Sequence, residues 1–386
     1  GSITGGGTLN YYTNYTGNML SSDVSMFAGT INVTTDADGG NFVLYSTKGY
    51  ERAKINLNNL VTMMYRITSN ITIPVGDLTG MTNSVLGAGG GGVCKVTWEV
   101  GARNVNSTFN GKITNNQITG TGAVAAISKV GTGTWTLTNA NTFTGGTEIN
   151  NGTLMVNNTS GSGLGTGETS VYTDATLAGS GIIFGSLRIA DGGTLAPGNG
   201  VGTFTVNNNV NILAGGILSV EIDKSNAKND SLTWTGTVTM GGRLEVEALN
   251  VTAFVVGDSF KIINGTVTGT PTEIIPATPG DGLEWDLSEF NTAGTLKVKA
   301  YTGIKALEMN SDIYPIPCKN NLNIRLKENA ENLQVALYNL VGNEVYENSY
   351  NNQPEIQLNL SDLPKGIYML HLTAENKSFT KKIVKE

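Results

Sequence analysis

The sequence predicts an all-β protein in which a long β-solenoid is followed by a small β-sandwich. The 386 residues include 51 glycines but only 9 prolines, and charged residues make up only 14%. Along the first 300 residues a glycine, a small residue and a short alternating apolar run recur, and the composition changes near residue 300. Abundant glycine, asparagine and threonine between short apolar runs is typical of strands joined by tight turns.

The repeated unit is a strand in which apolar and polar residues alternate. Early units follow one another at intervals of about 20 residues, which lies within the range of solenoid repeats. One such strand cannot bury its apolar face alone, so we expect successive coils to stack about 4.8 Å apart. An antiparallel sandwich with glycine-rich hairpins is the alternative. The units lie at residues 7–9, 29–33, 133–137, 152–156, 175–177, 193–195, 216–220, 242–246 and 294–298.

Corners between the strands of one coil need residues that tolerate a positive φ or favour turns. Gly152 follows Asn151 directly before one unit, and Asp174 and Asp191 precede two others. Within the units the alternation predicts that Leu195 faces the core. Residues 1–125 are less regular, and their alternating runs predict earlier and more decorated coils.

Two segments of the solenoid carry a family resemblance. Residues 129–154 run from Lys129 through Gly-Thr-Trp-Thr-Leu and Asn-Thr-Phe-Thr-Gly-Gly-Thr to Leu154, and residues 192–206 read Gly-Gly-Thr-Leu-Ala-Pro-Gly and then Gly-Thr-Phe-Thr-Val. This pattern resembles the autotransporter-associated β-strand repeat of bacterial surface passengers, most clearly over residues 125–250. The resemblance implies a right-handed parallel β-helix over residues 1–300, of the kind that serves as a display stalk or adhesin. It implies no active site.

The last part of the chain differs from the solenoid in composition and pattern. Glycine becomes sparse and lysine and glutamate more frequent, after an expected linker at residues 301–310. Well-separated alternating strands at this spacing predict a compact sandwich over residues 311–386. The expected strands are residues 322–326, 334–340, 355–360, 366–373 and 378–384. The expected inward residues are Leu322, Ile324, Leu326, Ile356, Leu358 and Leu360.

Four motifs follow one another in this module: Ile-Tyr-Pro-Ile-Pro at 313–317, Leu-Tyr-Asn-Leu-Val-Gly at 337–342, Leu-Pro-Lys-Gly-Ile-Tyr at 363–368 and Lys-Lys-Ile-Val-Lys at 381–385. The ordered set resembles the type A C-terminal sorting domain, an immunoglobulin-like sandwich, of the Bacteroidetes type IX secretion system. Ile316 departs from the family, which usually has asparagine between the two prolines. The motif residues carried over are Pro315, Pro317, Gly342, Gly366, Tyr368, Lys381, Lys382 and Lys385. The resemblance implies that the type IX machinery is a partner and that the protein reaches the extracellular space or the outer-membrane surface.

Charge and cysteine content exclude several classes of partner. The formal net charge is −7, and no basic stripe is present to follow a phosphate backbone, so we expect no nucleic-acid partner. No apolar stretch approaches the roughly 20 residues that a transmembrane helix needs. Cys94 and Cys318 stand far apart in different predicted domains, so free thiols are expected, with a disulfide between them as the alternative.

The sequence predicts a protein without catalysis or cofactor. His371 is the only histidine, so neither a Ser/His/Asp triad nor a histidine-based zinc site can be assembled in the solenoid. The enzymatic alternative is a polysaccharide lyase or hydrolase, or the non-catalytic C-terminal part of one. A lyase could use Asp36 and Asp38 as calcium ligands with Arg52 or Arg66 as the base. Residues 36–40 lack the third ligand and distal glutamate of a calcium loop, so they are expected to form an acidic turn.

Two further alternatives concern carbohydrate. Asp174 and Asp191 lie one repeat apart and could align as paired glycosidase carboxylates, although corners account for both. Exposed tyrosines of the first coils could stack on sugar rings as a glycan-binding module, although capping of the core is the expected role. These are Tyr11, Tyr12, Tyr15, Tyr45, Tyr50 and Tyr65. We therefore expect a structural or adhesin-like surface protein whose ligand is a polysaccharide or a host surface.

Overall fold

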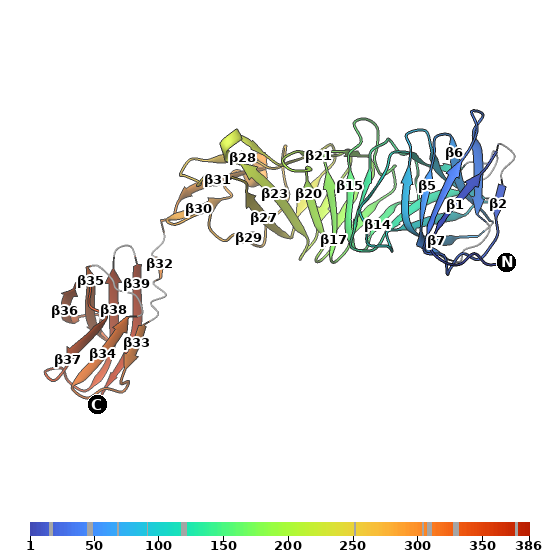
Figure 1. Ribbon diagram of the computed structural model, residues 1–386. Coiled ribbons are helices and arrows are strands. Elements are labelled where there is room, and N and C mark those ends of the chain that lie inside the picture. Colours follow the sequence, from blue (N-terminus) through green and yellow to red (C-terminus); the bar gives the residue numbers. More distant parts are fainter. Residues whose placement is uncertain are drawn as a thin grey trace. The chain divides into compact units, whose positions relative to one another are not determined.

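The computed structural model divides into two compact units, Gly1–Ala300 and Tyr301–Glu386, and both consist mainly of strands (Figure 1). The residues that the structure describes are 1–14, 18–44, 49–67, 69–90, 92–116, 122–250, 252–302, 305–306, 311–326, 332–374 and 377–386. Of the expected linker at 301–310, residues 303–304 and 307–310 lie outside the described residues, and Lys305–Ala306 form strand β32.

The first unit is a parallel β-helix in which three ladders of strands run along the stack. In the first ladder each strand between the two end strands pairs in parallel with the strand one coil earlier and the strand one coil later. Its strands are β1 (Thr8–Tyr12), β3 (Thr30–Thr34), β5 (Tyr50–Leu57), β7 (Ile71–Gly80), β10 (Ser107–Phe109), β13 (Thr134–Leu137), β15 (Gly152–Val156), β17 (Ala175–Gly179), β20 (Thr194–Pro197), β23 (Ile217–Asp223), β27 (Arg243–Ala248) and β29 (Ile274–Ile275).

The other two ladders are parallel as well. The second contains the first half of β7, then β9 (Lys95–Val100), β12 (Val124–Lys129), β14 (Thr147–Ile149), β16 (Thr169–Val171), β19 (Leu187–Ile189), β22 (Val210–Ile212) and β26 (Val238–Met240). The third contains β2 (Asn18–Leu20), β4 (Gly40–Leu44), β6 (Val61–Ile67), β8 (Val85–Gly90) and β11 (Lys112–Asn116), and further along β18 (Ile182–Ile183), β21 (Thr203–Val206) and β25 (Ser231–Trp234). Since β20, β21 and β22 follow one another in the chain, one coil visits the first, third and second ladder in turn.

The core is a stack of apolar columns inside the coils. Leu154, Leu177, Leu195, Leu218 and Leu244 are register partners on successive strands of the first ladder, and each is fully buried. Each leucine therefore removes apolar surface of the coils above and below it from water, which is the main source of stability in such a stack. The sequence-based prediction of stacked coils with Leu195 facing inward is confirmed.

Corners need residues with unusual backbone freedom where two coils approach closely. Gly152 has φ +63°, and a Cβ at this position would lie 2.4 Å from the carbonyl oxygen of Gly131 on the preceding coil. A side chain there would therefore clash with the neighbouring backbone, which explains why the repeated unit begins with glycine at this corner.

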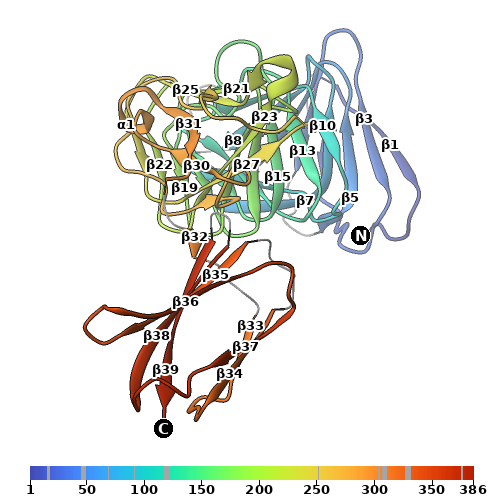
Figure 2. The ribbon, with the colours of Figure 1, turned by 90° about the vertical axis from the view of Figure 1, so that its left-hand side faces the viewer.

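The prediction that residues 294–298 form another coil is wrong. These residues belong to β31 (Thr295–Ala300), which pairs antiparallel with β28 (Ser259–Lys261) and β30 (Leu283–Asp286). Gly294 is the left-handed C-cap of the short helix α1 (Phe290–Ala293) rather than a solenoid corner. Figure 2 shows β30, β31 and α1 in front of the coils, at the C-terminal end of this unit. Phe254, Phe260 and Trp285 pack edge to face in this region and cover apolar surface at that end of the stack.

A short hairpin also interrupts the stack of coils. The 3-10 helix η1 (Lys224–Asn226) joins β23 to β24 (Lys228–Asn229), and these two strands pair antiparallel. The chain thereby folds back on β23 before it enters β25 of the third ladder.

The second unit is an antiparallel sandwich with a core of its own, and Figure 2 shows its two sheets as separate layers. One sheet contains β36 (Glu344–Tyr350), β35 (Leu333–Asn339), β38 (Gly366–Ala374), β39 (Lys377–Lys385) and the short β32. The other contains β33 (Ser311–Tyr314), β34 (Asn321–Leu326) and β37 (Glu355–Asn359). All six expected inward residues, from Leu322 to Leu360, are buried. The predicted all-β fold of a parallel β-helix followed by an immunoglobulin-like sandwich is confirmed.

Candidate functional site

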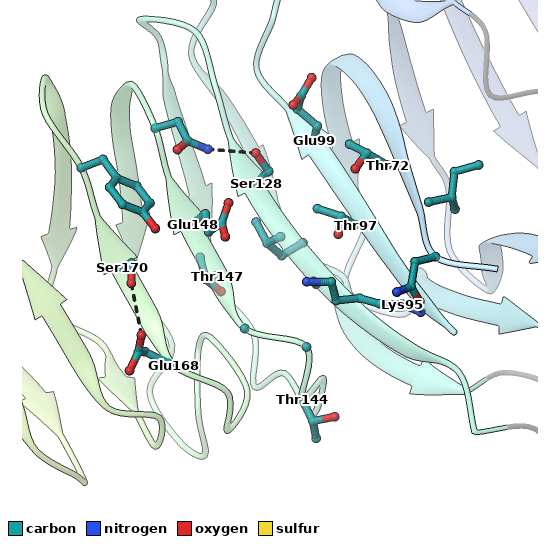
Figure 3. Close-up of a pocket in the computed structure, with 18 residues that line it drawn as sticks. Thr72, Lys95, Thr97, Glu99, Ser128, Thr144, Thr147, Glu148, Glu168 and Ser170 are labelled. Atoms are coloured by element: carbon teal, nitrogen blue, oxygen red, sulfur yellow. Dashed lines mark hydrogen bonds between the residues drawn. The ribbon is translucent and has the colours of Figure 1, made fainter. Parts of the chain in front are cut away.

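A groove of about 690 Å³ lies on the outer face of the second ladder (Figure 3). It crosses β7, β9, β12, β14 and β16, which are five consecutive coils. We call it the second-ladder groove. Outward residues, which alternate with core residues along each strand, supply most of its lining.

Small residues make the floor of this groove low. Ala126 of β12 is only 3% exposed, and Gly145 and Gly146 lie beside it on the next coil. The Gly145 N–H donates to the carbonyl oxygen of Ala125 at 2.9 Å, and a Cβ on Gly145 would come within 2.4 Å of that oxygen. A larger residue would therefore push the coil outward and fill the hollow.

Polar side chains form a column along the groove. Glu99, Ser128, Glu148 and Ser170 are register partners on successive strands, so carboxylates alternate with hydroxyls at the spacing of the coils. Arg188, the register partner of Ser170 on the next coil, is not among the residues that line the groove. The Asn150 amide donates to the Ser128 hydroxyl at 3.1 Å. The column thus presents hydrogen-bonding groups at regular intervals of about 4.8 Å.

Glu168 and Lys95 complete the charged groups of the groove (Figure 3). Glu168 accepts hydrogen bonds from Ser170 and Ser186, each at 3.4 Å. Three carboxylates therefore face one ammonium group, which favours a neutral or cationic ligand over an anionic one.

The carboxylates of Glu99 and Glu148 are two coils apart, so their strand positions are separated by about 9 to 10 Å. This lies at the upper end of the separation used by inverting glycosidases, about 6.5 to 9.5 Å. Within the described part of the chain, neither carboxylate accepts a hydrogen bond that would fix its position.

The weak calcium candidates lie elsewhere, in the turn between β3 and β4. Asp36 accepts hydrogen bonds from the Tyr12 hydroxyl at 3.0 Å and from the Asp38 backbone N–H at 3.1 Å. Among the described residues no cluster of three or more His, Cys, Asp or Glu side chains could hold a metal ion. Among the described residues, Arg52 forms no ion pair with Asp36 or Asp38. The side chain of Arg66 lies outside the described residues.

The other sequence candidates fall on corners or in the core. Asp174 has φ +62°, and its N–H donates to the carbonyl of Gly192, next to Asp191 on the following coil. Tyr50 and Tyr65 are buried, and Tyr11 packs on the Phe42 ring with centroids 5.0 Å apart. Tyr12 is 55% exposed, while Tyr15 and Tyr45 lie outside the described residues. The described tyrosines therefore form no continuous exposed row.

Neither cysteine nor the histidine is among the described residues that line the second-ladder groove. Cys94 and Cys318 are both buried and form no disulfide, and burial raises the pKa of each thiol. His371 lies on β38 with Nδ1 2.8 Å from the Thr380 hydroxyl and its ring against Tyr338. Among the described residues, no carboxylate or serine contacts this imidazole.

The sorting-motif residues cluster by role within the sandwich. Gly342 has φ +83° at the exposed turn between β35 and β36, and the Tyr368 hydroxyl donates to the carbonyl of Pro364 at 2.7 Å. Pro315 and Pro317 are exposed before β34, and Gly366 opens β38. Lys381 and Lys382 lie on β39 with exposed or half-buried side chains. Lys385 is buried, and its backbone pairs with that of Cys318 in an isolated parallel β-bridge.

Sequence reasoning missed the residues of the second-ladder groove. Glu99 lies in one of the alternating runs of residues 1–125, so the alternation indicated that it faces outward, whereas no strand was predicted at Glu148. Their alignment with Ser128 depends on the register of coils of unequal length, which the spacing of the motifs does not fix.

Comparison with known proteins finds similarity in both parts of the chain. Residues 312–386 match the family described as the secretion system C-terminal sorting domain, and residues 127–156 match the passenger-associated transport repeat. An extracellular serine protease of Serratia marcescens is 29% identical over 177 residues, which is 43% of this chain. The chain covers only 16% of the length of that protein.

Two solved structures also resemble parts of the chain. One is a DUF3244-family protein with an immunoglobulin-like β-sandwich from Bacteroides vulgatus, at 17% identity and a TM-score of 0.20, covering 22% of this chain and 92% of that one. The other is PorZ, a surface component of the type IX secretion system of Porphyromonas gingivalis, at 17% identity and a TM-score of 0.18, covering 29% of this chain and 16% of that one.

The fold and the family matches define a secreted β-helical protein with a type IX sorting domain. The sorting domain interacts with the secretion machinery, and the protein is exported to the cell surface or the extracellular space. No helix in the described ranges is long and apolar enough to cross a membrane.

Proposed function

We propose that this protein is a non-catalytic, adhesin-like element of the cell surface whose β-helix binds a neutral polysaccharide in the second-ladder groove. The observation that carries the proposal is the column Glu99, Ser128, Glu148 and Ser170, which offers acceptors and hydroxyls one coil apart across an open hollow. Sugar hydroxyls can donate hydrogen bonds to such carboxylates.

The charge of the groove argues against a lyase that acts on acidic polysaccharides. Such an enzyme would bring calcium and a basic residue to an anionic substrate, but this groove presents three carboxylates and only Lys95 as a cation. The serine protease activity named for the Serratia relative is not part of the proposal. The only histidine of this chain, His371, lies in the sorting domain rather than in the solenoid.

The test is retention of the purified chain by neutral and acidic polysaccharides, with product release measured in the same samples. Glu148→Gln should weaken retention by about five- to tenfold. A charged hydrogen bond contributes about 1.5 to 3 kcal/mol, and solvent around this open groove reduces that contribution. Glu245→Gln, on the outer face of the first ladder, serves as the matched control. Equal retention of both variants would refute binding in the second-ladder groove.

A glycoside hydrolase is the second candidate, because Glu99 and Glu148 stand two coils apart on one face. If the protein is a hydrolase, the parent protein should release reducing sugar, and both Glu99→Gln and Glu148→Gln should abolish this release. Retention without product supports the binding function, whereas product that depends on both carboxylates would replace it with hydrolysis.

Export has a separate test. Deleting residues 312–386 should leave the solenoid folded, because this unit has its own core, but should keep the protein inside the cell envelope. The measurement is the fraction of the chain at the surface of a host with a type IX system. Normal surface display of the shortened chain would contradict the role of the sorting domain.

A further inference from the structure

A second polar row lies on the outer face of the first ladder, near the N-terminal end of the solenoid. Asn10, Asn32, Asn56 and Thr79 occupy equivalent outward positions on β1, β3, β5 and β7. The Asn32 amide donates to Asn10 Oδ1 at 3.1 Å, the Asn56 amide donates to Asn32 Oδ1 at 2.7 Å, and the Thr79 hydroxyl donates to Asn56 Oδ1. We call this row the amide ladder.

The hydrogen-bonding capacity of the amide ladder is only partly used. A primary amide has two N–H donors and an oxygen with two lone pairs. Within the described part of the chain, Asn32 and Asn56 each use one donor and one lone pair along the ladder. Each of these coils therefore still offers one donor and one acceptor side by side. A pair of neighbouring hydroxyls, as on a pyranose ring, matches this donor–acceptor pair.

The ladder also holds its amides in place before any ligand arrives. Hydrogen bonds along the row fix the side-chain rotamers, so binding loses little conformational entropy. The interval between coils is about 4.8 Å. That interval is close to the length of one sugar ring in an extended β-1,4-linked chain, so successive rings can meet successive amides.

The surroundings of the amide ladder select an uncharged ligand. The row lies in a hollow of about 480 Å³, which no ionisable side chain of the described residues lines. Thr34, Asn58 and Asn110 add uncharged polar groups, and Met81, which is 50% exposed, adds an apolar surface for the C–H face of a sugar. Strand addition by a peptide is disfavoured, because the backbone groups of β3 and β5 already pair with strands on both sides.

We propose that the amide ladder is a second glycan-binding strip, specific for neutral, extended β-linked polysaccharides and separate from the second-ladder groove. The inference goes beyond the proposed function, because it rests on a different face of the solenoid and on amides rather than carboxylates.

The experiment is affinity electrophoresis of the full chain in gels that contain hydroxyethyl cellulose, xyloglucan or galactomannan, with carboxymethyl cellulose as the anionic counterpart. The double variant Asn32→Thr, Asn56→Thr removes the free amide groups but keeps a residue type that Thr79 already places in the same column. Asn211→Thr, an exposed outward asparagine of β22, is the matched control. Circular dichroism and the melting temperature establish that each variant is folded, and the single variant Asn32→Thr replaces the double one if that fails to fold.

The expected result is retardation by at least one neutral glycan, weakened about tenfold in the ladder variant and unchanged in Asn211→Thr, with less retardation by carboxymethyl cellulose. If only Glu148→Gln weakens retardation, the amide ladder is purely structural and this inference fails while the proposed function stands. If retardation weakens in the ladder variant but not in Glu148→Gln, the amide ladder binds the glycan and the proposed function of the second-ladder groove fails. Absence of retardation by all three neutral glycans overturns the inference.

Discussion

The solenoid and the sandwich bury similar residues in different ways. In the solenoid, Leu195 packs against Leu177 and Leu218, which are equivalent residues one coil before and one coil after it. In the sandwich, Leu370 is paired with Leu337 across an antiparallel ladder, and the core closes between two sheets. The solenoid is therefore stabilised by contacts between neighbouring coils, and the sandwich by one shared core.

This difference also separates where each unit can make contacts. The outer faces of the solenoid repeat one position at every coil, which produces extended rows such as the second-ladder groove and the amide ladder. The sandwich has no such repeat: Gly342 lies in a turn and Gly366 at the start of a strand, whereas Lys381 and Lys382 lie within β39. Rows suit a polymeric ligand, whereas turns suit recognition by another protein.

The largest effect is expected from a charge inside the solenoid. Leu195→Asp places an unpaired carboxylate in the apolar column and should lower the free energy of unfolding by several kcal/mol. Calorimetry should show the solenoid transition lost or moved to much lower temperature, with the transition of the sandwich retained. Thr194→Asp, the half-buried outward neighbour, is the control and should change stability by less than about 1 kcal/mol. An unchanged melting curve for Leu195→Asp would refute the stacking.

A comparable change in the sandwich should have the converse result. Leu370 is fully buried, so Leu370→Asp should remove the sandwich transition and leave the solenoid transition in place. Because the sandwich core contains far fewer residues than the solenoid core, this variant should unfold the whole unit rather than a few coils. The exposed Gln334→Asp on β35 is the matched control. Simultaneous loss of both transitions would show that the two units do not fold independently.

The sequence predicted the sandwich strands with apolar faces and missed those without. Residues 322–326 and 355–360 alternate clearly, and β34 and β37 lie there. The edge strand β36 (Glu344–Tyr350) was not predicted, because its residues are half-buried or exposed and carry no apolar alternation. Pairing with β35 along one side, rather than burial, holds this strand in the sheet.

In the solenoid the inward columns were predictable and the outward rows were not. A leucine or isoleucine directly precedes each of Asn10, Asn32 and Asn56, and this recurring pair of residues could have revealed the amide ladder. The charged column through Glu99, Ser128 and Glu148 has no such signal, because two adjacent coils there differ in length. Parallel pairing across coils is a long-range property that only the folded register defines.

Lys129 allows a smaller, pH-dependent test of the solenoid core. Its side chain is 1% exposed in the column between Val100 and Ile149, and Nζ donates to the carbonyls of Val130, Gly131 and Asn151 at 2.7, 2.8 and 3.1 Å. Burial lowers the pKa of this ammonium to about 8 from its ordinary value of 10.5. The folded protein therefore binds fewer protons than the unfolded chain between about pH 8 and 10.5, so its stability should rise with pH in this window.

Lys129→Met should abolish this rise, which amounts to about 3 kcal/mol over the whole window, because the pKa falls from 10.5 to about 8 and one unit of pKa corresponds to 1.36 kcal/mol. The measurement is urea unfolding between pH 7.5 and 10, with the variant subtracted from the parent protein. The subtraction matters because burial raises the pKa of Tyr50, which makes stability fall at the upper end of the same range. Identical pH profiles for the two proteins would mean that Lys129 is solvated in solution.

The smallest change in stability is expected at the turn between β35 and β36 of the sandwich. Leu340 and Val341 are 72% and 84% exposed there, while Asn339 Oδ1 accepts hydrogen bonds from the N–H groups of Val341 and Asn343 at 3.1 and 2.9 Å. The backbone of the turn is thus held by Asn339 and not by the two apolar side chains. Leu340→Ser with Val341→Ser should leave the melting temperature within about 2 °C, because exposed substitutions rarely change stability by more than about 0.5 kcal/mol.

Export is where we expect this double variant to differ. The sorting domain interacts with the secretion machinery, and we expect the two neighbouring exposed apolar side chains of this turn to be part of the surface that the machinery contacts. Surface display should therefore fall severalfold in the double variant and remain normal in Gln353→Ser, an exposed change in the turn between β36 and β37. Normal display of the double variant would restrict recognition to the other motif residues, such as Lys381 and Lys382. Loss of surface display with an unchanged melting temperature would show that the residues recognised by the machinery are not those that stabilise the sandwich.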